Sequence, residues 1–305
     1  MTKAYVYPGQ GAQAVGMGAD LLDSPLGKTA SEICGFDLVQ TMSEGPAELL
    51  QSTAYCQPAL FLHSALVMEE MEKRGLELDA QFHLGLSLGE YTALYGAGVM
   101  SFEDVMSALA VRGQAMQDAC DITEGGMVSV IGLDAQTVID VCDKARGNGV
   151  LQAANFNAPG QIVVSGDMQA VERSLALLKE AGARRAMPLK VAGAFHSALM
   201  APAAEKLEEC LKKCTFKEGA EKVISNVTAE AHDPSKIIET LVAQITAPVL
   251  WSQSIENLIA KGVDSFSEWG TGKILSGLIK RVSKEVNLEQ AGSKEDLDKL
   301  FAVAE

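Results

Sequence analysis

A serine between two glycines is the residue in this chain best placed to act as a nucleophile. Gly85-Leu86-Ser87-Leu88-Gly89 fits the pattern Gly-x-Ser-x-Gly, with a strand-like segment before it and a helical segment after it. Side chains at the two glycine positions of so sharp a turn would clash, and the serine is presented at the helix N-terminus, where backbone N–H groups can stabilise an oxyanion. The pattern predicts a nucleophilic Ser87. A glycine-rich packing turn is the alternative.

A serine nucleophile needs a general base, and the chain has four histidines that could supply it. His63 lies in an apolar helical stretch and His83 within a strand, which is typical of structural histidines. His232 lies in a polar loop, which indicates a surface residue. His196 follows a strand and precedes a helix, and such loops commonly hold catalytic groups. We therefore predict that His196 is the base, with helix capping as the alternative.

An arginine falls on the apolar face of a helix expected over residues 102–120. Arg112 continues a series of apolar residues spaced by three and four, so it should point inward. A buried guanidinium needs an anionic partner, and its planar fork suits a carboxylate. Two interpretations stay open, an internal salt bridge and a receptor for a substrate carboxylate.

Strands alternate with helices along most of the chain, which predicts an α/β fold with a mainly parallel sheet covered on both faces. Among the expected elements are strands over residues 5–7, 81–86, 222–226 and 263–268, and helices over 53–73, 88–97, 198–213, 237–245, 252–261 and 274–285. Ser101 should cap the helix that follows it. The charged tail beyond Leu288 is expected to be partly frayed.

Residues 125–191 have a different order of expected elements, β-α-β-β-α-β, which is that of a ferredoxin-like unit. We interpret this segment as a small subdomain inserted into a larger α/β core made of residues 1–124 and 192–305. Within it, two strands expected over residues 151–155 and 161–165 should be joined by a turn at Ala158-Pro159-Gly160.

Composition excludes several classes of function. The net charge of −15 argues against non-specific nucleic-acid binding, which needs clustered cations. The six cysteines have no paired spacing, so neither a zinc or other metal site nor a disulfide framework is expected. No run of 18 apolar residues could span a membrane, and Pro8-Gly9 interrupts the N-terminus before a signal sequence could form. We expect a cytoplasmic protein.

Several motifs, in order from about residue 3 to residue 285, resemble those of the malonyl-CoA:acyl carrier protein transacylase family. They are PGQGAQ at 8–13, GLSLGE at 85–90, RG at 112–113, NFNAPGQ at 155–161, FHSALM at 195–200 and QITAPVLW at 244–251. Together they are far more specific than any one of them. One position departs from the pattern, because the family usually has histidine before the serine and this chain has Leu86. That difference bears on acyl selectivity rather than on activation of the serine.

The resemblance implies an α/β-hydrolase-like core and a role for each matching residue. Ser87 would be the nucleophile, His196 the general base and then acid, and the main-chain carbonyl of Gln244 would orient His196 in place of a triad aspartate. The other implied roles are an oxyanion hole from the N–H groups of Gln10 and Leu88, and substrate binding by Arg112, Phe195 and Asn155. Malonyl would pass from malonyl-CoA to Ser87 and then to the phosphopantetheine thiol of acyl carrier protein, in fatty-acid or polyketide synthesis. No cofactor is implied beyond the coenzyme A thioester that serves as substrate.

Selectivity and docking can also be anticipated. In related acyltransferase domains of polyketide synthases, the segment AFH resembles that of domains that use malonyl, and ASH that of domains that use methylmalonyl. This chain has Ala194-Phe195-His196, so the resemblance predicts a preference for malonyl. An acidic carrier should meet local cations, of which two clusters are available: Arg184, Arg185 and Lys190, and Lys273, Lys280 and Arg281. An esterase or lipase would not need an inward arginine and should carry an acidic third member. A non-catalytic docking protein would not need serine, histidine and arginine together.

Overall fold

The larger of two structural units is built on a parallel sheet of four strands. The computed structural model describes residues 2–76 and 78–301. The strand order is β2 (Phe82–Gly85), β1 (Lys3–Tyr7), β7 (Ser265–Trp269) and β8 (Asn287–Ala291), and every neighbouring pair is parallel. The predicted α/β fold class is confirmed.

Helices cover both faces of this sheet, because the side chains of β1 alternate between two apolar clusters. Tyr5 and Tyr7 pack with α4 (Thr53–Lys73), α5 (Gly89–Gly96) and α6 (Phe102–Ile122). Ala4 and Val6 pack on the opposite side with α11 (Trp251–Ala260) and α12 (Ile274–Val282). The remaining helices of this unit are α1 (Pro25–Cys34), α2 (Leu38–Glu44), α3 (Ala47–Gln51), α9 (Ala201–Leu211), α10 (Ile237–Ala243) and α13 (Lys294–Phe301).

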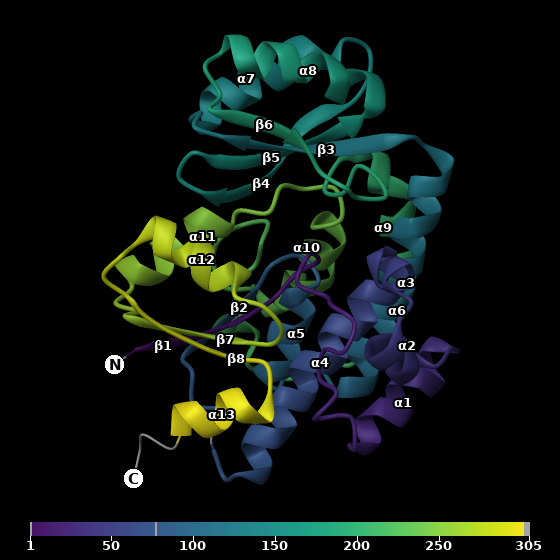
Figure 1. Ribbon diagram of the computed structural model, residues 1–305, viewed down its shortest axis with the longest axis vertical. Helices are drawn as coiled ribbons and strands as arrows, with labels where there is room; N and C mark the ends of the chain where they lie inside the picture. Colours follow the sequence, from purple (N-terminus) through teal and green to yellow (C-terminus); the bar gives the residue numbers. More distant parts are fainter. Residues whose placement is uncertain (1, 77, 302–305) are drawn as a thin grey trace.

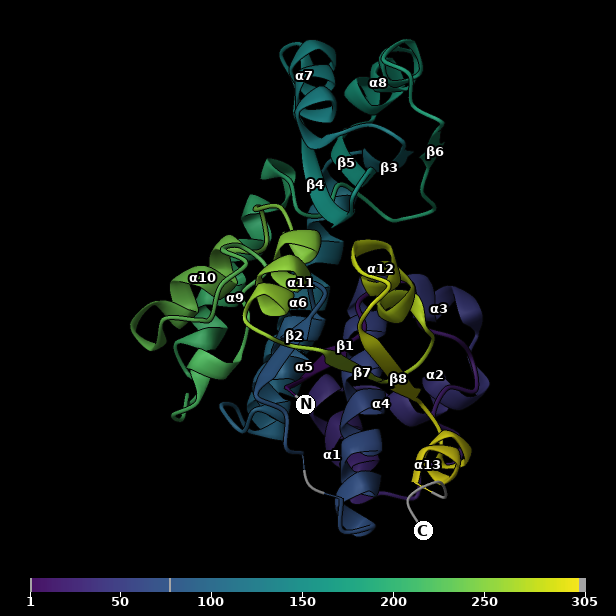
Figure 2. The ribbon, with the colours of Figure 1, turned by 90° about the vertical axis from the view of Figure 1, so that its left-hand side faces the viewer.

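A second, antiparallel sheet forms a layer of its own above the first unit (Figures 1 and 2). Its order is β4 (Leu151–Ala158), β5 (Gln161–Asp167), β3 (Gly125–Ile131) and β6 (Arg185–Pro188). Helices α7 (Ala135–Arg146) and α8 (Met168–Glu180) pack on its outer face, so its other face is turned toward the large unit. The ferredoxin-like order predicted for this stretch is what the structure shows.

Two expectations about secondary structure were wrong. Residues 222–226 do not form a strand, and only isolated bridges occur there, at Val223 and Ile224. The backbone N–H of Asn226 donates to a carboxylate oxygen of Glu90 instead of to a neighbouring strand, which ends the pairing. From Glu289 to Phe301 the tail is ordered as the end of β8 and as α13, because β8 pairs with β7 and Leu297 is fully buried. The last four residues, over which the expected fraying also extends, lie outside the described part of the chain.

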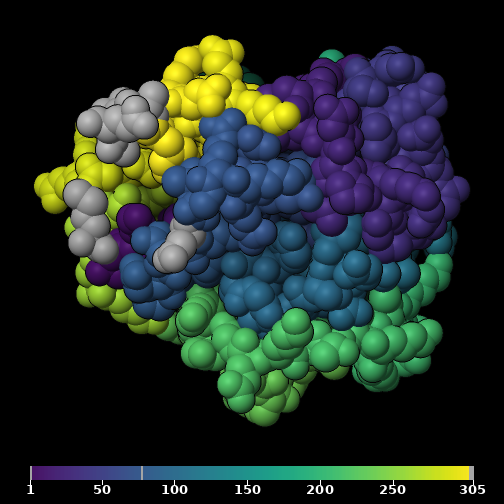
Figure 3. Space-filling view, turned by 90° about the horizontal axis from the view of Figure 1, so that it is seen from below, coloured from purple at the N-terminus to yellow at the C-terminus, as the bar shows by residue number. Residues whose placement is uncertain are grey.

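The face turned away from the small sheet is built by segments from both ends of the chain. In Figure 3 the N-terminal helices, in purple, lie beside the C-terminal segment, in yellow. Arg74 at the end of α4 contacts Asp298 of α13 at 2.7 Å, which ties the C-terminal helix to this face. Within residues 2–76 and 78–301, no helix is both long enough and apolar enough to cross a membrane.

Candidate active site

Ser87 lies at the sharp turn between β2 and α5. Its φ of 58° is in the left-handed region, which a residue with a side chain rarely adopts and which the surrounding structure must hold. A Cβ atom on Gly85 would overlap the backbone of Gly89, and one on Gly89 would overlap the carbonyl oxygen of Tyr7. The two glycines of the motif are therefore needed for the turn itself.

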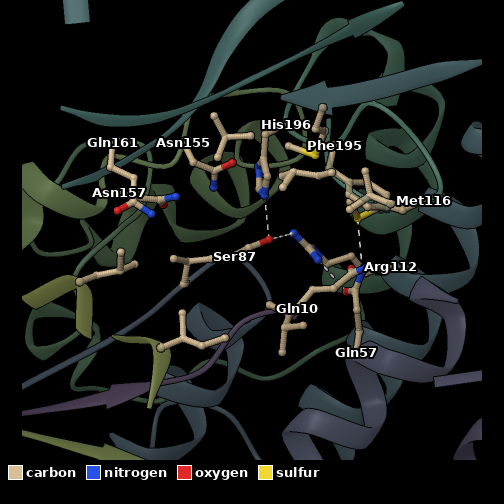
Figure 4. A pocket seen from close by; sticks show the side chains of 18 residues that line it. Gln10, Gln57, Ser87, Arg112, Met116, Asn155, Asn157, Gln161, Phe195 and His196 are labelled. Carbon is tan, nitrogen blue, oxygen red and sulfur yellow. Dashed lines mark hydrogen bonds between the residues drawn. The ribbon is translucent and has the colours of Figure 1, made fainter. Parts of the chain in front are cut away.

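His196 reaches the serine from the loop that follows β6. Its Nε2 lies 2.8 Å from Ser87 Oγ (Figure 4), and its Nδ1 lies 2.9 Å from the main-chain oxygen of Gln244. Because a carbonyl oxygen only accepts, Nδ1 must carry the hydrogen, which leaves Nε2 to accept the serine hydroxyl proton. The contacts by themselves thus select the tautomer that a general base requires.

The histidine is also held in its neutral form. Its side chain is buried, and burial together with the positive charge of Arg112 lowers the pKa of His196 to about 4. Both effects disfavour the imidazolium, since a charge is costly in a low-dielectric site and a second cation lies nearby. At neutral pH the ring is ready to accept a proton.

Arg112 is buried, with 1% of its surface exposed, and it contacts the nucleophile directly. One terminal nitrogen donates to Gln57 Oε1 at 2.6 Å, and the other donates to Ser87 Oγ at 3.0 Å and to Gln244 Oε1 at 2.8 Å. The guanidinium lies 5.6 Å from the centre of the Tyr91 ring. None of the ion pairs among the described residues includes Arg112, so the internal salt bridge considered above is not formed.

This leaves a buried cation without a carboxylate in contact. Burial lowers the pKa of Arg112, and its Nε atom has no hydrogen-bond partner among the described residues. A buried charge in this state is ready to gain from an anion that enters the site. The arrangement favours a ligand with a carboxylate close to the group that Ser87 attacks.

Two backbone N–H groups near Ser87 are free to bind an oxyanion. Gln10 follows β1 and Leu88 follows the serine, and both residues line the same cavity. Neither N–H group donates to a backbone carbonyl anywhere in the described part of the chain. Donors of this kind, fixed before the reaction, are what an oxyanion hole supplies.

A cavity of about 220 Å³ extends from Ser87 between the large unit and the small sheet. Its walls are mostly apolar, with Met116 from α6, Met127 from β3 and Val163 from β5. Amide side chains face it from the β4–β5 hairpin, at Asn155, Asn157 and Gln161 (Figure 4). Such a site suits a short acyl group on a longer, amide-containing arm.

Comparison with known proteins identifies the family. Residues 4–285 match the family model described as acyl transferase domain. The chain is 42% identical over 302 residues to the malonyl CoA-acyl carrier protein transacylase of Bacillus subtilis, with 97% of this chain and 95% of that protein covered. The chain belongs to the malonyl CoA-acyl carrier protein transacylase family. The family resemblance drawn from the motifs is thereby confirmed.

Solved structures of this transacylase family share the fold. An acyl carrier protein S-malonyltransferase from Vibrio cholerae aligns with a TM-score of 0.93 at 40% identity, covering 98% of this chain and 100% of the other. A malonyl-transacylase solved in complex with its type II polyketide-synthase acyl-carrier protein aligns with a TM-score of 0.93 at 35% identity, covering 100% of this chain and 99% of the other.

The residues that the sequence singled out lie together. Those that line the cavity are Gln10, Ser87, Leu88, Arg112, Asn155, Phe195 and His196. Gln244 lies behind them, fully buried, and contacts Ser87, Arg112 and His196 from there. Leu86, the departure from the family pattern noted in the sequence, also lines the cavity.

His232 does not lie on the surface, contrary to the expectation. It is 3% exposed, and its Nε2 lies 2.7 Å from a carboxylate oxygen of Glu90. The polar character of its local sequence was misleading because the segment folds back beneath the nucleophile and packs against α5. The histidine is a buried partner of an acid rather than a surface residue.

Sequence reasoning missed Gln57, Asn226 and Glu90. Gln57 stands among apolar residues of α4, a signal that could have indicated an inward amide. Asn226 accepts from the Ser87 N–H at 2.7 Å and donates to the Gly85 carbonyl at 2.8 Å, which no local pattern announces. Glu90 lies in the GLSLGE motif but was given no role.

Proposed function

We propose that this chain transfers malonyl from malonyl-CoA to the phosphopantetheine thiol of an acyl carrier protein through an ester on Ser87. The observation that carries the proposal is Arg112, a buried cation without a carboxylate in contact, 3.0 Å from the nucleophile oxygen. The relatives in Bacillus subtilis and Vibrio cholerae, a malonyl CoA-acyl carrier protein transacylase and an acyl carrier protein S-malonyltransferase, support the same activity. The carrier that accepts the malonyl group determines whether the product enters fatty-acid or polyketide synthesis.

The first half-reaction acylates the enzyme. Ser87 Oγ attacks the thioester carbonyl carbon while His196 Nε2 takes the hydroxyl proton, and the developing oxyanion is bound by the N–H groups of Gln10 and Leu88. The carbon–sulfur bond then breaks, and the imidazolium returns the proton to the departing coenzyme A sulfur. The Gln244 carbonyl holds the Nδ1 hydrogen throughout, the role that a carboxylate has in a Ser-His-Asp triad.

The second half-reaction reverses these steps with a different thiol. His196 takes the proton from the carrier's phosphopantetheine thiol, and the thiolate attacks the Ser87 ester. The tetrahedral intermediate releases the serine oxygen, which recovers the proton from His196, and the malonyl group leaves on the carrier. These steps require the two thiol carriers and the chain's own residues, with coenzyme A acting as a substrate rather than as a bound cofactor.

Arg112 and the cavity wall would define the acyl group. The malonyl carboxylate would replace the serine hydroxyl as the partner of the Arg112 fork, and its negative charge would offset the cation that depresses the pKa of His196. Phe195 and Met116 would pack beside the methylene carbon. Asn155 and the neighbouring hairpin amides would bind the arm of either thioester.

The carrier protein would dock on cations that lie near the cavity. Lys190 lies between the cavity residues Leu189 and Val191, and Lys273 precedes Ile274 at the same cavity, so one cation of each predicted cluster adjoins a cavity residue in the chain. An acidic carrier docking there would place its thiol near Ser87. A cytoplasmic location stays a prediction.

The test is intact-mass spectrometry of the purified protein after mixing with malonyl-CoA, followed by addition of a phosphopantetheinylated carrier. We expect the mass of one malonyl ester on the protein, mapped to Ser87, and its disappearance as malonyl-carrier forms. A protein that gains no adduct, or whose adduct is lost only to water, would contradict the transferase assignment. Hydrolysis without transfer would favour the esterase alternative.

A further inference from the structure

Glu90 is a buried carboxylate behind the nucleophile, and neither half-reaction of the proposed transfer uses it. Glu90 is the second residue of α5 and is 0% exposed. One of its oxygens accepts from His232 Nε2 at 2.7 Å. The other accepts from the backbone N–H of Asn226 at 2.9 Å and from Gln244 Nε2 at 2.7 Å. All of these contacts are donors, so the carboxylate is a fixed acceptor at the centre of a buried network.

Gln244 connects this carboxylate with the reacting groups. Its Nε2 donates to Glu90 and to the Ser87 carbonyl, at 3.0 Å for the latter, while its Oε1 accepts from Arg112. A carboxylate can only accept and a guanidinium can only donate, so the two ends of the amide can be placed in one way only. The main-chain oxygen of the same residue accepts from His196 Nδ1. A shift of Gln244 would therefore disturb the nucleophile, the base and the carboxylate receptor together.

Asn226 connects Glu90 with the strained turn. Its Oδ1 accepts from the Ser87 N–H and its Nδ2 donates to the Gly85 carbonyl, so one side chain holds the backbone on both sides of position 86. Ser87 has a φ of 58°, and a backbone in that region persists only where its surroundings enforce it. The N–H of Asn226 is in turn held by Glu90. Glu90 therefore anchors the clamp that keeps the serine in place.

We propose that Glu90 is a positioning residue for acyl transfer: its carboxylate sets the places of Gln244 and Asn226, and through them those of Ser87, Arg112 and His196. The length of the Glu90 side chain is decisive, because its carboxylate must reach two donors, the Asn226 N–H and Gln244 Nε2. His232 completes the acceptor's environment by donating from Nε2, and its Nδ1 has no partner among the described residues. The inference rests on the proposed function for its choice of substrates.

Two substitutions separate reach from charge. Glu90→Asp keeps the charge but withdraws the carboxylate by roughly 1.5 Å, the length of one carbon–carbon bond. Glu90→Gln keeps the reach and removes the charge. Its amide oxygen can accept from Asn226 and Gln244, while His232 can change tautomer and accept from the new NH₂ group. Positioning thus predicts that glutamine is the better replacement, whereas a purely electrostatic role predicts aspartate.

The experiment measures single-turnover acylation of each variant by malonyl-CoA and by acetyl-CoA, with intact mass as the readout. The malonyl-to-acetyl ratio does not depend on the folded fraction, so it distinguishes misplacement of Arg112 from simple loss of stability. We expect Glu90→Asp to lose on the order of a hundredfold in malonyl acylation, as a displacement of about 1 Å can cause, and to lose most of the malonyl preference. Glu90→Gln should remain within about tenfold of wild type with its preference intact, since its hydrogen bonds survive.

Glu268 supplies a matched control. It is also 0% exposed and accepts from Leu275 N, Ser276 N and Ser276 Oγ at 3.1, 2.8 and 2.7 Å, without contact to Gln244. Glu268→Asp and Glu268→Gln should change the unfolding temperature and leave the malonyl-to-acetyl ratio unchanged.

Three results would overturn the proposal. The first is a wild-type acylation rate together with a wild-type malonyl-to-acetyl ratio in Glu90→Asp. The second is faster acylation of the aspartate variant than of the glutamine variant. The third is a loss of acylation rate above about a hundredfold in Glu90→Gln with the fold intact, because such a loss exceeds what one hydrogen bond accounts for. The glutamine result decides the matter alone if the aspartate variant does not fold. Absence of any Ser87 adduct in the wild type would instead refute the proposed function, which keeps the two failures distinct.

Discussion

The two walls of the cavity differ in how their side chains are held. On the wall of the large unit, Ser87 and Arg112 have hydrogen-bond partners on several elements, and Gln244 links them from behind. On the wall of the small sheet, Met127 and Val163 are apolar, and the Oδ1 atom of Asn157 has no partner among the described residues. The wall of the large unit is a connected hydrogen-bond network, whereas the wall of the small sheet is mainly an apolar surface.

Substitutions in the two walls should therefore have different effects. Changes in the hydrogen-bonded wall should reduce the rate for every acyl group, because they alter the reacting atoms. Changes at the apolar side should alter which acyl group is accepted. Arg112 lies in the first wall but is proposed to bind the substrate carboxylate, so its substitution should show both effects.

Removal of the nucleophile should have the largest effect. Ser87→Ala deletes the oxygen that forms the ester, so we expect no acyl adduct and a loss of at least about four orders of magnitude in transfer. The fold should persist, because alanine can replace serine without a new clash in the turn. Intact-mass spectrometry with malonyl-CoA and a thermal unfolding curve provide the measurement. A malonyl adduct on another residue of this variant would contradict the role of Ser87.

Removal of the base should have the next largest effect. His196→Ala should slow acylation by about two to four orders of magnitude, the usual contribution of a positioned general base. Rapid-quench measurement with both malonyl-CoA and acetyl-CoA should show an equal loss for the two, since the base acts on the serine and not on the acyl group. A loss below tenfold would point to another base.

The pH dependence of the wild type tests the same histidine. Because burial and Arg112 lower the pKa of His196 to about 4, the neutral ring should predominate well below pH 6.5. The value of kcat/KM for malonyl-CoA should therefore stay nearly level from pH 8 to about pH 5.5, and it should fall as the His196 imidazole gains a proton near pH 4. The opposite outcome, a fall centred near pH 6.5, would mean that the site does not depress the pKa of His196.

Arg112→Ala should reduce malonyl transfer far more than acetyl transfer. A malonyl carboxylate would be left buried and unpaired, at a cost of about 3–5 kcal/mol, whereas acetyl has no charge to bury. Arg112→Lys should restore only part of the loss, since an ammonium lacks the planar fork. Competition between malonyl-CoA and acetyl-CoA measures the effect. An equal fall for both acyl groups would show that Arg112 serves the structure and not the substrate.

Phe195→Ser should change selectivity with a smaller effect on rate. The ring lines the cavity beside His196, where it would exclude the extra methyl of methylmalonyl (Figure 4). Discrimination of one methyl in a pocket is worth about 1–3 kcal/mol, or roughly 10–200-fold, so wild type should prefer malonyl-CoA by that range and the variant should not. The control is the rate of ester hydrolysis, which water in the new space could raise. An unmoved ratio would make Phe195 a packing residue only.

Charge reversal in the two cationic clusters should have the smallest effect. The exposed cations Arg184, Arg185 and Lys190, and Lys273, Lys280 and Arg281, form no ion pair among the described residues. Reversing each cluster should raise KM for the carrier several-fold, by about 1 kcal/mol or less per exposed charge, and leave KM for malonyl-CoA unchanged. Steady-state kinetics with each substrate varied in turn measure this. Unchanged carrier kinetics after reversal of both clusters would reject the docking surface.

The sequence determined those features that depend on a few neighbouring residues. The turn at Ser87 could be predicted because glycine is required on both sides of it, and the inward direction of Arg112 because helical spacing places it on a buried face. Helix α4 has the predicted bounds, Thr53–Lys73, and Ser101 caps α6 through a bond from the Asp104 N–H, since capping and periodicity are local as well.

Tertiary structure decided what those residues contact. His232 was expected on the surface because its neighbours are polar, yet it lies against Glu90, 142 positions away in the chain. The contact of Arg112 with Gln244 and the clamp by Asn226 likewise join segments that are distant in sequence, 132 and 139 positions apart. No local pattern encodes such contacts, because they arise only when burial forces each polar group to find a partner among the residues that packing has brought near.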